Sequence, residues 1–268
     1  MNAAAISLGF IQGITEFLPV SSSGHLALVK AIAGYRDMTL SFDLILHIAT
    51  LLAVFLYFLS DIVLVLFEWC YGFFNVNARR WTGWRFGWAI IAGTIVTGPI
   101  GILLKPFVER VSTNMLWLGA DFLVTGALLF SLKFFAAGDD AVGVKNAWFV
   151  GLAQGLAVYP GVSISGATIW AGLVTGLSKE EAFRFSFILS IPAIIGASLF
   201  EARELGGLAE FVNSLPDGWL YAAIAAFVSG FISLVMLRRL VVRSKWGGFS
   251  LYCIALGCVV VIYSVMGA

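Results

Sequence analysis

Residues 12–25 read Gln-Gly-Ile-Thr-Glu-Phe-Leu-Pro-Val-Ser-Ser-Ser-Gly-His and place a polar cluster inside an otherwise apolar chain. The cluster holds a carboxylate, an amide, three consecutive serines and one of the chain's two histidines. Apolar, helix-forming runs flank it at residues 3–10 and 26–33. Because polar groups are costly in hydrocarbon, a membrane segment carries them where they face protein or a water-filled cavity. We therefore interpret this stretch as a functional site.

The composition is typical of a polytopic α-helical membrane protein. Of the 268 residues, 60% are hydrophobic and only 12% are charged, and the mean hydropathy is +0.98. Soluble domains carry about twice that share of charged residues. The formal net charge of +1 gives no reason to expect a nucleic-acid partner. We expect one integral membrane domain over residues 1–268.

Two apolar segments are interrupted where a span should continue. Pro19 breaks the first into residues 3–18 and 24–33, and Pro160-Gly161 breaks the second into residues 148–159 and 163–177. Each half is too short to cross about 30 Å of hydrocarbon at about 1.5 Å per residue. Broken backbone is tolerated at membrane depth where it lines a cavity, so both segments are predicted to be re-entrant helix hairpins. Six full-length spans are expected at residues 42–59, 86–104, 115–135, 183–200, 219–237 and 249–266, with an amphipathic connection at residues 61–77.

The two broken segments repeat each other. Gln12-Gly13 recurs as Gln154-Gly155, and the serine turn at residues 21–24 recurs at residues 163–166, both at an offset of 142. Each repeat, about 1–140 and about 141–268, contains one hairpin and three spans. Because three is odd, the second repeat must be inverted relative to the first. Inverted repeats place a binding site near the membrane midplane, where their broken helices meet.

Basic residues are distributed unequally between the two faces of this topology. The first face collects Arg79, Arg80, Arg85, Lys133, Lys145, Lys179, Arg184, Arg238, Arg239, Arg243 and Lys245, and the second collects Lys30, Arg36, Lys105, Arg110 and Arg203. The positive-inside rule makes the richer face cytoplasmic. We therefore expect a multi-pass plasma-membrane protein with both termini, and the mouth of the first hairpin, outside.

The residue types in the two serine turns favour a phosphate ligand. Helices that begin at Ser21, Ser22 and Ser23 and at residues 163–165 would direct their positive ends and unpaired backbone N–H groups into one cavity. Gly24 and Gly166 lie in the first turns of these helices and belong to the same predicted phosphate-binding set.

The first turn also carries groups for chemistry. Ser22 and His25 are three residues apart and share a helix face. His25 could deprotonate Ser22, attack phosphorus itself or protonate a leaving oxygen. Glu16 follows Gln12 by one helical turn, and its carboxylate could orient His25 or help to hold a divalent cation. His47 lies in the middle of a span, where it could line the same cavity or be a hydrogen-bonded core histidine.

Gln12-x-x-x-Glu16, followed by Phe-Leu-Pro-Val-Ser-Ser-Ser-Gly-His-Leu at residues 17–26, closely resembles the first signature of the BacA-type undecaprenyl-diphosphatases. Residues 160–168 look like the second signature, and residues 183–193 are similar to the segment that follows it. The resemblance implies a membrane phosphatase that converts a C55 isoprenoid diphosphate to the monophosphate. That reaction recycles the lipid carrier for cell-wall glycans and associates the family with bacitracin resistance.

By matching position, the resemblance assigns site roles. Gln12 and Glu16 take the acidic-motif positions, and Ser22 and His25 take the positions of the catalytic pair. The phosphate-binding loop falls on Ser163, Ser165 and Thr168. The resemblance also implies a divalent cation, expected to be Mg²⁺, with Glu16 as a possible ligand.

One position departs from the family pattern. The second signature ordinarily reads Pro-Gly-x-Ser-Arg-Ser-Gly, and Ile164 stands in place of its arginine. Arg184 could reach the site from the next span instead. Loss of the arginine favours a polyprenyl-phosphate transporter, or a catalytically weakened paralogue that only binds the lipid. The grouping of Ser22, His25 and Glu16 favours the enzyme, which is the leading prediction.

Overall fold

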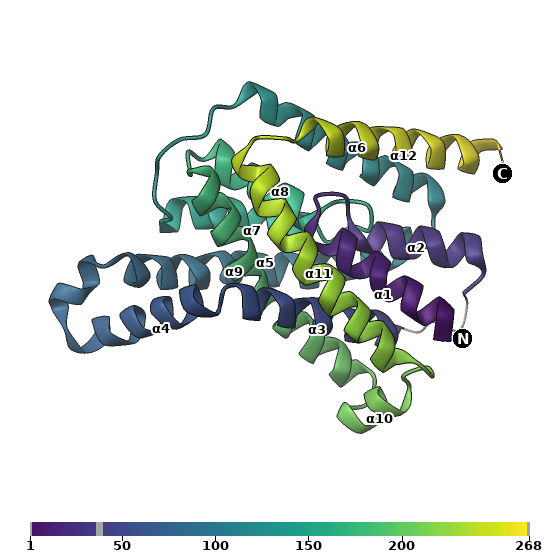
Figure 1. Ribbon diagram of the computed structural model, residues 1–268, viewed down its shortest axis with the longest axis horizontal. Helices are drawn as coiled ribbons and strands as arrows, with labels where there is room; N and C mark the ends of the chain where they lie inside the picture. Colours follow the sequence, from purple (N-terminus) through teal and green to yellow (C-terminus); the bar gives the residue numbers. More distant parts are fainter. Residues whose placement is uncertain (1, 36–39, 267–268) are drawn as a thin grey trace.

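The computed structural model describes residues 2–35 and 40–266, and most of this chain is helical (Figure 1). Arg36, which the sequence assigns to the face with fewer basic residues, lies outside the described residues. The first half contains α1 (Asn2–Phe17), α2 (Ser22–Ala33), α3 (Leu40–Tyr57), α4 (Leu59–Phe74), the 3₁₀ helix η1 (Val76–Arg80), α5 (Thr82–Val111) and α6 (Met115–Ser131). The second half contains the 3₁₀ helix η2 (Leu132–Phe134), α7 (Val144–Leu156), α8 (Ile164–Val174), α9 (Lys179–Glu204), α10 (Leu208–Asn213), α11 (Trp219–Val242) and α12 (Gly247–Met266).

Among the described residues, five helices are long and apolar enough to cross a membrane, namely α5, α6, α9, α11 and α12. They correspond to five of the six expected spans. The sixth, expected at residues 42–59, is α3, which passes the same test only together with α4. The two helices are bent by 72° from each other, and α4 occupies most of the connection expected at residues 61–77. The chain is thus an all-helical, multi-pass membrane protein.

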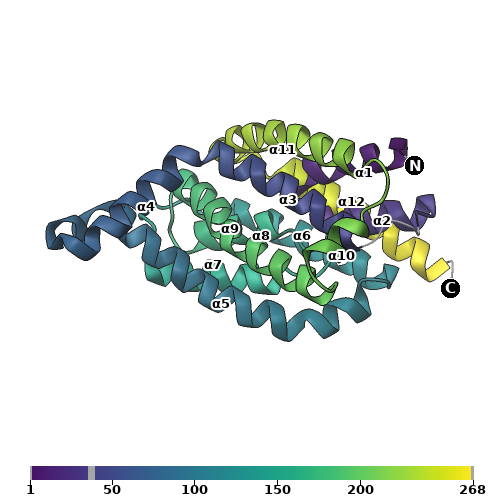
Figure 2. The same cartoon turned by 90° about the horizontal axis from the view of Figure 1, so that it is seen from below.

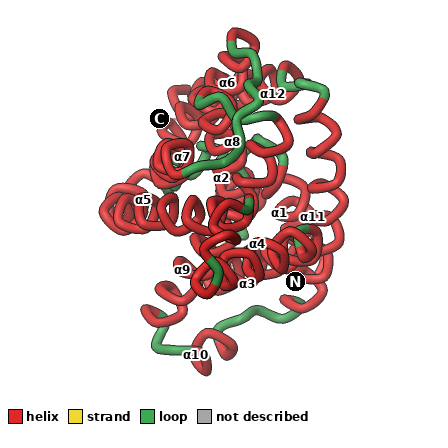
Figure 3. Tube along the Cα trace, turned by 90° about the vertical axis from the view of Figure 1, so that its left-hand side faces the viewer, coloured by secondary structure: helices red, strands yellow, loops and turns green. Residues whose placement is uncertain are grey.

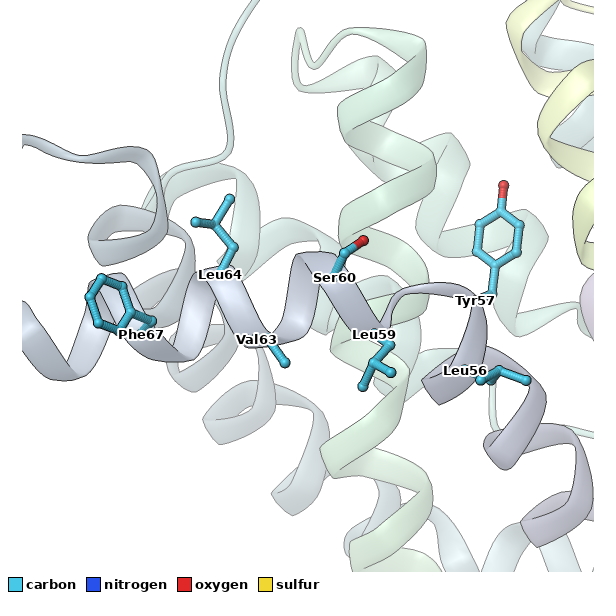
Figure 4. Close-up of a pocket in the computed structure, with 7 residues that line it drawn as sticks. All are labelled: Leu56, Tyr57, Leu59, Ser60, Val63, Leu64 and Phe67. Carbon is cyan, nitrogen blue, oxygen red and sulfur yellow. The ribbon is translucent and has the colours of Figure 1, made fainter.

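Aromatic packing fixes the bend between α3 and α4. Phe58 lies between the two helices and is buried, with its ring 5.7 Å from that of Phe183 and 6.2 Å from that of Phe187 on α9. Beside the bend, an open, mainly apolar groove of about 770 Å³ is lined by Leu56, Tyr57, Leu59, Ser60, Val63, Leu64 and Phe67 (Figure 4). Leu56 follows His47 by roughly 13 Å of helix. The groove is therefore separate from the serine turns.

Small residues allow α1 to lie directly against α11. A Cβ atom on Gly9 would lie 2.2 Å from the carbonyl oxygen of Ala222, and one on Gly13 would lie 2.4 Å from that of Ala226. Both contacts are with backbone, so the two helices would have to separate to admit a side chain. Close packing of this kind holds helices together in lipid, where the surroundings are as apolar as the helices.

The pair α5 and α7 is built in the same way. A Cβ atom on Gly151 would lie 2.5 Å from the carbonyl oxygen of Gly93. The Thr97 hydroxyl lies 3.0 Å from the Gly151 carbonyl oxygen and 2.9 Å from Oε1 of Gln154. Thr97 and Gln154 are both buried, so this polar contact is shielded from lipid.

The serine turns of the two hairpins are buried, with Ser21 4% and Ser163 2% exposed. Seen along the long axis, α2 and α8 are central, between the pair α6 and α12 and the pair α3 and α9 (Figure 3). The first turn of α1 and the last turn of α12 lie at the same end of the molecule (Figure 2). This arrangement places the turn of each hairpin in the interior of the bundle.

Candidate active site

The first serine turn joins α1 to α2 and is organised by Ser21. Its φ angle is 68°, a conformation that non-glycine residues seldom adopt. Its hydroxyl caps α2 by accepting a hydrogen bond from the Gly24 N–H at 3.3 Å. The cap satisfies one of the N–H groups that have no partner within the helix at its start.

The second serine turn joins α7 to α8 and is organised by Ser163. Its hydroxyl accepts a hydrogen bond from the Gly166 N–H at 3.0 Å and lies 3.2 Å from the Ser165 hydroxyl. The Ser163 N–H donates to the Thr125 hydroxyl of α6 at 2.9 Å, and that hydroxyl donates to the Gly161 carbonyl at 2.7 Å. Helix α6 thereby holds the second turn from outside.

The two turns are in contact. The Gly161 N–H donates to the Ser21 hydroxyl at 3.0 Å, across 140 residues of sequence. A Cβ atom on Gly24 would lie 2.9 Å from Cα of Gly161, and one on Gly166 would lie 3.3 Å from Cβ of Pro19. The expectation that the two hairpin turns meet is confirmed.

Glu16 is the centre of a polar cluster in the first half of the site. The Ser22 hydroxyl donates to Glu16 Oε2 at 2.5 Å, and Gln12 Nε2 donates to the same oxygen at 2.9 Å. His47 reaches the cluster from α3, with Nδ1 3.0 Å from Gln12 Nε2 and 3.4 Å from Glu16 Oε1. His47 therefore lines the same site as Glu16. The expected orientation of His25 by Glu16 is not found, because the carboxylate faces Ser22, Gln12 and His47.

His25 points to a different partner. Its Nδ1 lies 2.7 Å from the Ser21 carbonyl oxygen, and its Nε2 lies 2.7 Å from the Tyr252 hydroxyl of α12. The edge of its ring packs against Phe122, with the ring centroids 5.2 Å apart. The prediction of a Ser22–His25 pair is thus corrected: both residues lie in the first turn of α2, but Ser22 turns toward α1 and His25 toward α12.

Thr168 and Ile164 lie one turn apart in the second half of the site. The Thr168 side chain is 1% exposed, its hydroxyl donates to the Ile164 carbonyl at 2.8 Å, and it lies 2.5 Å from the Ser186 hydroxyl of α9. Ile164 is 43% exposed as the first residue of α8. The phosphate-binding role of Thr168 stays a prediction, and Ile164 offers no charge to a ligand.

Arg184 does not replace the motif arginine. Its Nε lies 2.7 Å from Asp61 Oδ1, its Nη1 lies 3.5 Å from Glu181 Oε1, and the guanidinium stacks 4.7 Å above the Phe86 ring. The expected supporting role is corrected by these contacts. A carboxylate on α4, which becomes available because α3 and α4 bend apart, holds the guanidinium at the junction of α4, α5 and α9.

The oxygen donors in the site fit a divalent cation only together with a ligand. No group of three or more His, Cys, Asp or Glu side chains able to hold a metal occurs within residues 2–35 and 40–266. The Glu16 carboxylate lies beside the Ser22 hydroxyl, and the buried Oε1 of Gln12 has no hydrogen-bond partner. Mg²⁺ is commonly held by one or two carboxylates plus substrate phosphates. These donors fit that kind of half-site.

The sequence motifs did not identify Tyr252 and Phe122, two residues that contact His25. Tyr252 is one aromatic residue in an apolar span, and Phe122 is one phenylalanine among 23. Their contacts with His25 depend on the packing of α6 and α12 against the first hairpin. No spacing rule links them to the serine motif.

The chain is similar to known proteins over nearly its whole length. Residues 5–259 match the family model described as "Bacitracin resistance protein BacA". A protein from Methanosphaera stadtmanae, named undecaprenyl-diphosphatase, is 40% identical over 275 residues, covering 98% of each chain. Proteins of the same name from Alkaliphilus metalliredigens (37% identical, 98% of each chain) and a Mycobacterium species (38% identical, 96% of this chain and 94% of the relative) are also similar.

Proposed function

The chain belongs to the BacA family, and on that premise we propose that it hydrolyses undecaprenyl diphosphate to undecaprenyl monophosphate and inorganic phosphate in the plasma membrane. The product is the carrier lipid for cell-wall glycans, and its recycling accounts for a role in bacitracin resistance. One observation carries the proposal: the Ser22 hydroxyl donates to Glu16 at 2.5 Å, in a turn that touches a second serine turn. A hydroxyl paired with a carboxylate is a nucleophile with its base.

The diphosphate is bound by the two helix starts. The N-termini of α2 and α8 supply backbone N–H groups and the positive ends of two helix dipoles, which favour an anion. The hydroxyls of Ser23 and Ser165 lie beside the capping serines, at 3.4 Å and 3.2 Å from Ser21 and Ser163 respectively. Together they supply neutral donors for the phosphate oxygens, and the isoprenoid chain remains in the hydrocarbon.

In the first chemical step, Glu16 takes the proton of the Ser22 hydroxyl while Ser22 Oγ attacks the terminal phosphorus. The Oγ–P bond forms, and the bond from phosphorus to the bridging oxygen breaks. The bridging oxygen keeps the electron pair and leaves as the lipid monophosphate. Ser22 is favoured over His25 as the attacking group, because its hydroxyl is paired with a carboxylate that can take its proton.

In the second step, water attacks the phosphorus of the phosphoserine. Its proton passes to His25, and Glu16 returns the first proton to Ser22 Oγ as the P–O bond breaks. Inorganic phosphate leaves, and His25 releases its proton to water, which restores the starting protonation of the site. General acid–base catalysis of this kind contributes about 10²- to 10⁴-fold to the rate.

We also propose that Mg²⁺ assists the reaction. Glu16, Ser22 and the unpartnered Oε1 of Gln12 would hold it together with the substrate phosphates. When bound, Mg²⁺ neutralises phosphate charge. That contribution matters more in a chain that carries Ile164 where the family has arginine.

The proposed fold is two inverted repeats with an outward-facing site. Helix α1 of the first repeat packs against α11 of the second, and α7 of the second packs against α5 of the first, while α6 and α12 pack against each other. This exchange of partners between the repeats supports the proposed fold. The close-contact glycines of α1, Gly9 and Gly13, recur in α7 as Gly151 and Gly155 at the offset of 142. The concentration of basic residues at the opposite end supports an outside location for the chain termini and the first hairpin's mouth.

The test is phosphate release from undecaprenyl diphosphate by the purified protein with Mg²⁺. Ser22→Ala and Glu16→Gln should each lower kcat by about 10²-fold or more. Ser7→Ala is the matched control, because Ser7 lies on α1 and its hydroxyl bonds only its own helix, at Ala3 and Ala4. Absence of phosphate release from the unmodified protein would overturn the proposal. Transport of the lipid phosphate by that inactive protein would restore the carrier alternative, which the names of the relatives do not favour.

A further inference from the structure

The imidazole of His25 is held at both nitrogens. Nδ1 lies 2.7 Å from the carbonyl oxygen of Ser21, and Nε2 lies 2.7 Å from the hydroxyl of Tyr252. A carbonyl oxygen can only accept a hydrogen bond, so the contact with Ser21 requires the proton on Nδ1. In the neutral ring Nε2 then carries the lone pair, and the Tyr252 hydroxyl is the donor to it.

The ring of Tyr252 also contacts the imidazole. It stacks on the imidazole with a centroid distance of 5.7 Å and an interplanar angle of 9°. The neighbouring Cys253 is buried, with its thiol 3.8 Å from the carbonyl oxygen of Pro19 in the first serine turn. Phe122 packs against the imidazole in a T-shaped arrangement, with an interplanar angle of 83°. The ring of His25 is thus enclosed by α6 and α12 as well as by its own turn.

We propose that Tyr252 is the positioning residue for His25. The Ser21 carbonyl requires the Nδ1–H tautomer, and the Tyr252 hydroxyl complements it by donating to the Nε2 lone pair. This second hydrogen bond holds the ring against rotation about its χ2 bond. This role rests on the proposed function, in which Nε2 receives the proton of the attacking water.

The pairing divides the site into two units with separate tasks. Ser22 and Glu16 form the attacking unit on α1 and α2. His25 and Tyr252 form the proton-accepting unit, to which α12 contributes across 227 residues of sequence. A residue that only braces the fold would not be expected to change the hydrogen bonding of Nε2 on one imidazole. That difference makes the proposal testable apart from stability.

The kinetic test is Tyr252→Phe, which keeps the stacked ring and removes only the hydroxyl. We expect kcat for phosphate release to fall about ten- to a hundredfold, the range that follows when a proton-transfer group loses its alignment. KM should stay within about twofold, because the substrate-binding turns are unchanged. The control is Tyr263→Phe, the same substitution on the same helix at a residue that is 70% exposed. A kcat for Tyr252→Phe equal to that of the control would overturn the proposal.

The spectroscopic test reads the imidazole directly. The chain contains two histidines, so ¹⁵N-histidine labelling in micelles gives two rings, which a His47→Gln sample assigns. In the unmodified protein His25 should show a protonated Nδ1 and a hydrogen-bonded, unprotonated Nε2. In Tyr252→Phe the Nε2 resonance should shift as its hydrogen bond is lost, while Nδ1 stays protonated against the Ser21 carbonyl.

The two tests separate the possible failures. An unchanged His25 spectrum in Tyr252→Phe overturns the positioning role even if kcat falls. If the unmodified protein releases no phosphate, the proposed function fails, and the spectra still decide whether Tyr252 sets the imidazole.

Discussion

Replacing Gly13 by alanine should displace the carboxylate of Glu16, the proposed base, without changing any of the proposed catalytic groups. A Cβ atom at this position would lie 2.4 Å from the carbonyl oxygen of Ala226 and 2.7 Å from the amide nitrogen of Gly230. Ordinary contacts begin at 3.4 Å, so the first distance is about 1 Å too short. Both atoms belong to the backbone of α11 and cannot rotate away. Helix α1 must therefore move by about 1 Å, and Glu16, one turn further along, moves with it.

A displacement of about 1 Å is large compared with what the hydrogen bond between Ser22 and Glu16 can tolerate. Ser22 lies on α2, so the 2.5 Å hydrogen bond to Glu16 joins two helices that are not displaced together. A misplacement of about 1 Å can lower a rate by about 10²-fold, which corresponds to roughly 2.7 kcal/mol of transition-state stabilisation. The overpacking itself should destabilise the fold by about 1–3 kcal/mol.

The assay is steady-state phosphate release from undecaprenyl diphosphate, with the melting temperature of each sample measured in the same micelles. Gly101→Ala in α5 is the control, because a Cβ atom there would meet only Val158 Cγ1 at 3.9 Å. It should retain both activity and melting temperature. Gly13→Ala with kcat within twofold of the unmodified protein would refute the reasoning, because Glu16 would then not depend on the contact between α1 and α11.

Three further predictions concern the second half of the site and its surroundings. Ile164→Arg should restore a cation at the exposed start of α8 and raise kcat/KM by about tenfold while lowering the Mg²⁺ concentration required; an unchanged Mg²⁺ titration would contradict it. Ser163→Ala removes the cap on the Gly166 N–H and should lower stability by about 1 kcal/mol, seen as a melting temperature reduced by about 2–4 °C; no reduction would show that the cap is dispensable. Arg184→Ala breaks the contact with Asp61 and should lower the melting temperature with turnover within about threefold; a hundredfold loss of turnover at an unchanged melting temperature would return Arg184 to the site.

Much of this architecture follows from local features of the sequence. Pro19 ends one helix, the serines begin the next, and the short apolar runs on either side cannot span a bilayer. These rules depend on neighbouring residues and on helix length, so they predict the broken helices and five of the spans directly. The repeated Gln-Gly and serine patterns also indicated that the two turns meet, and the contact of Ser21 with Gly161 confirms it.

The sequence placed the end of the α3 span near residue 59, but it did not determine the direction in which the chain continues. A connection that begins at residue 61 is compatible with a straight or a bent pair of helices. The burial of Phe58 against two phenylalanines of α9 selects the bend. The bend then brings Asp61 to Arg184 and removes the arginine from the region where a substitute for the missing motif cation was expected.

The residue types and their order were enough to show which chemical groups the chain carries and which helix holds each of them. The tertiary structure alone decided their partners: Ser22 with Glu16, and His25 with Tyr252. Spacing along a helix gives the face on which a side chain lies, but the group opposite depends on the depth and rotation of the neighbouring helix. Those are set by contacts of small residues over the whole length of α6, α11 and α12, and no short stretch of sequence contains them.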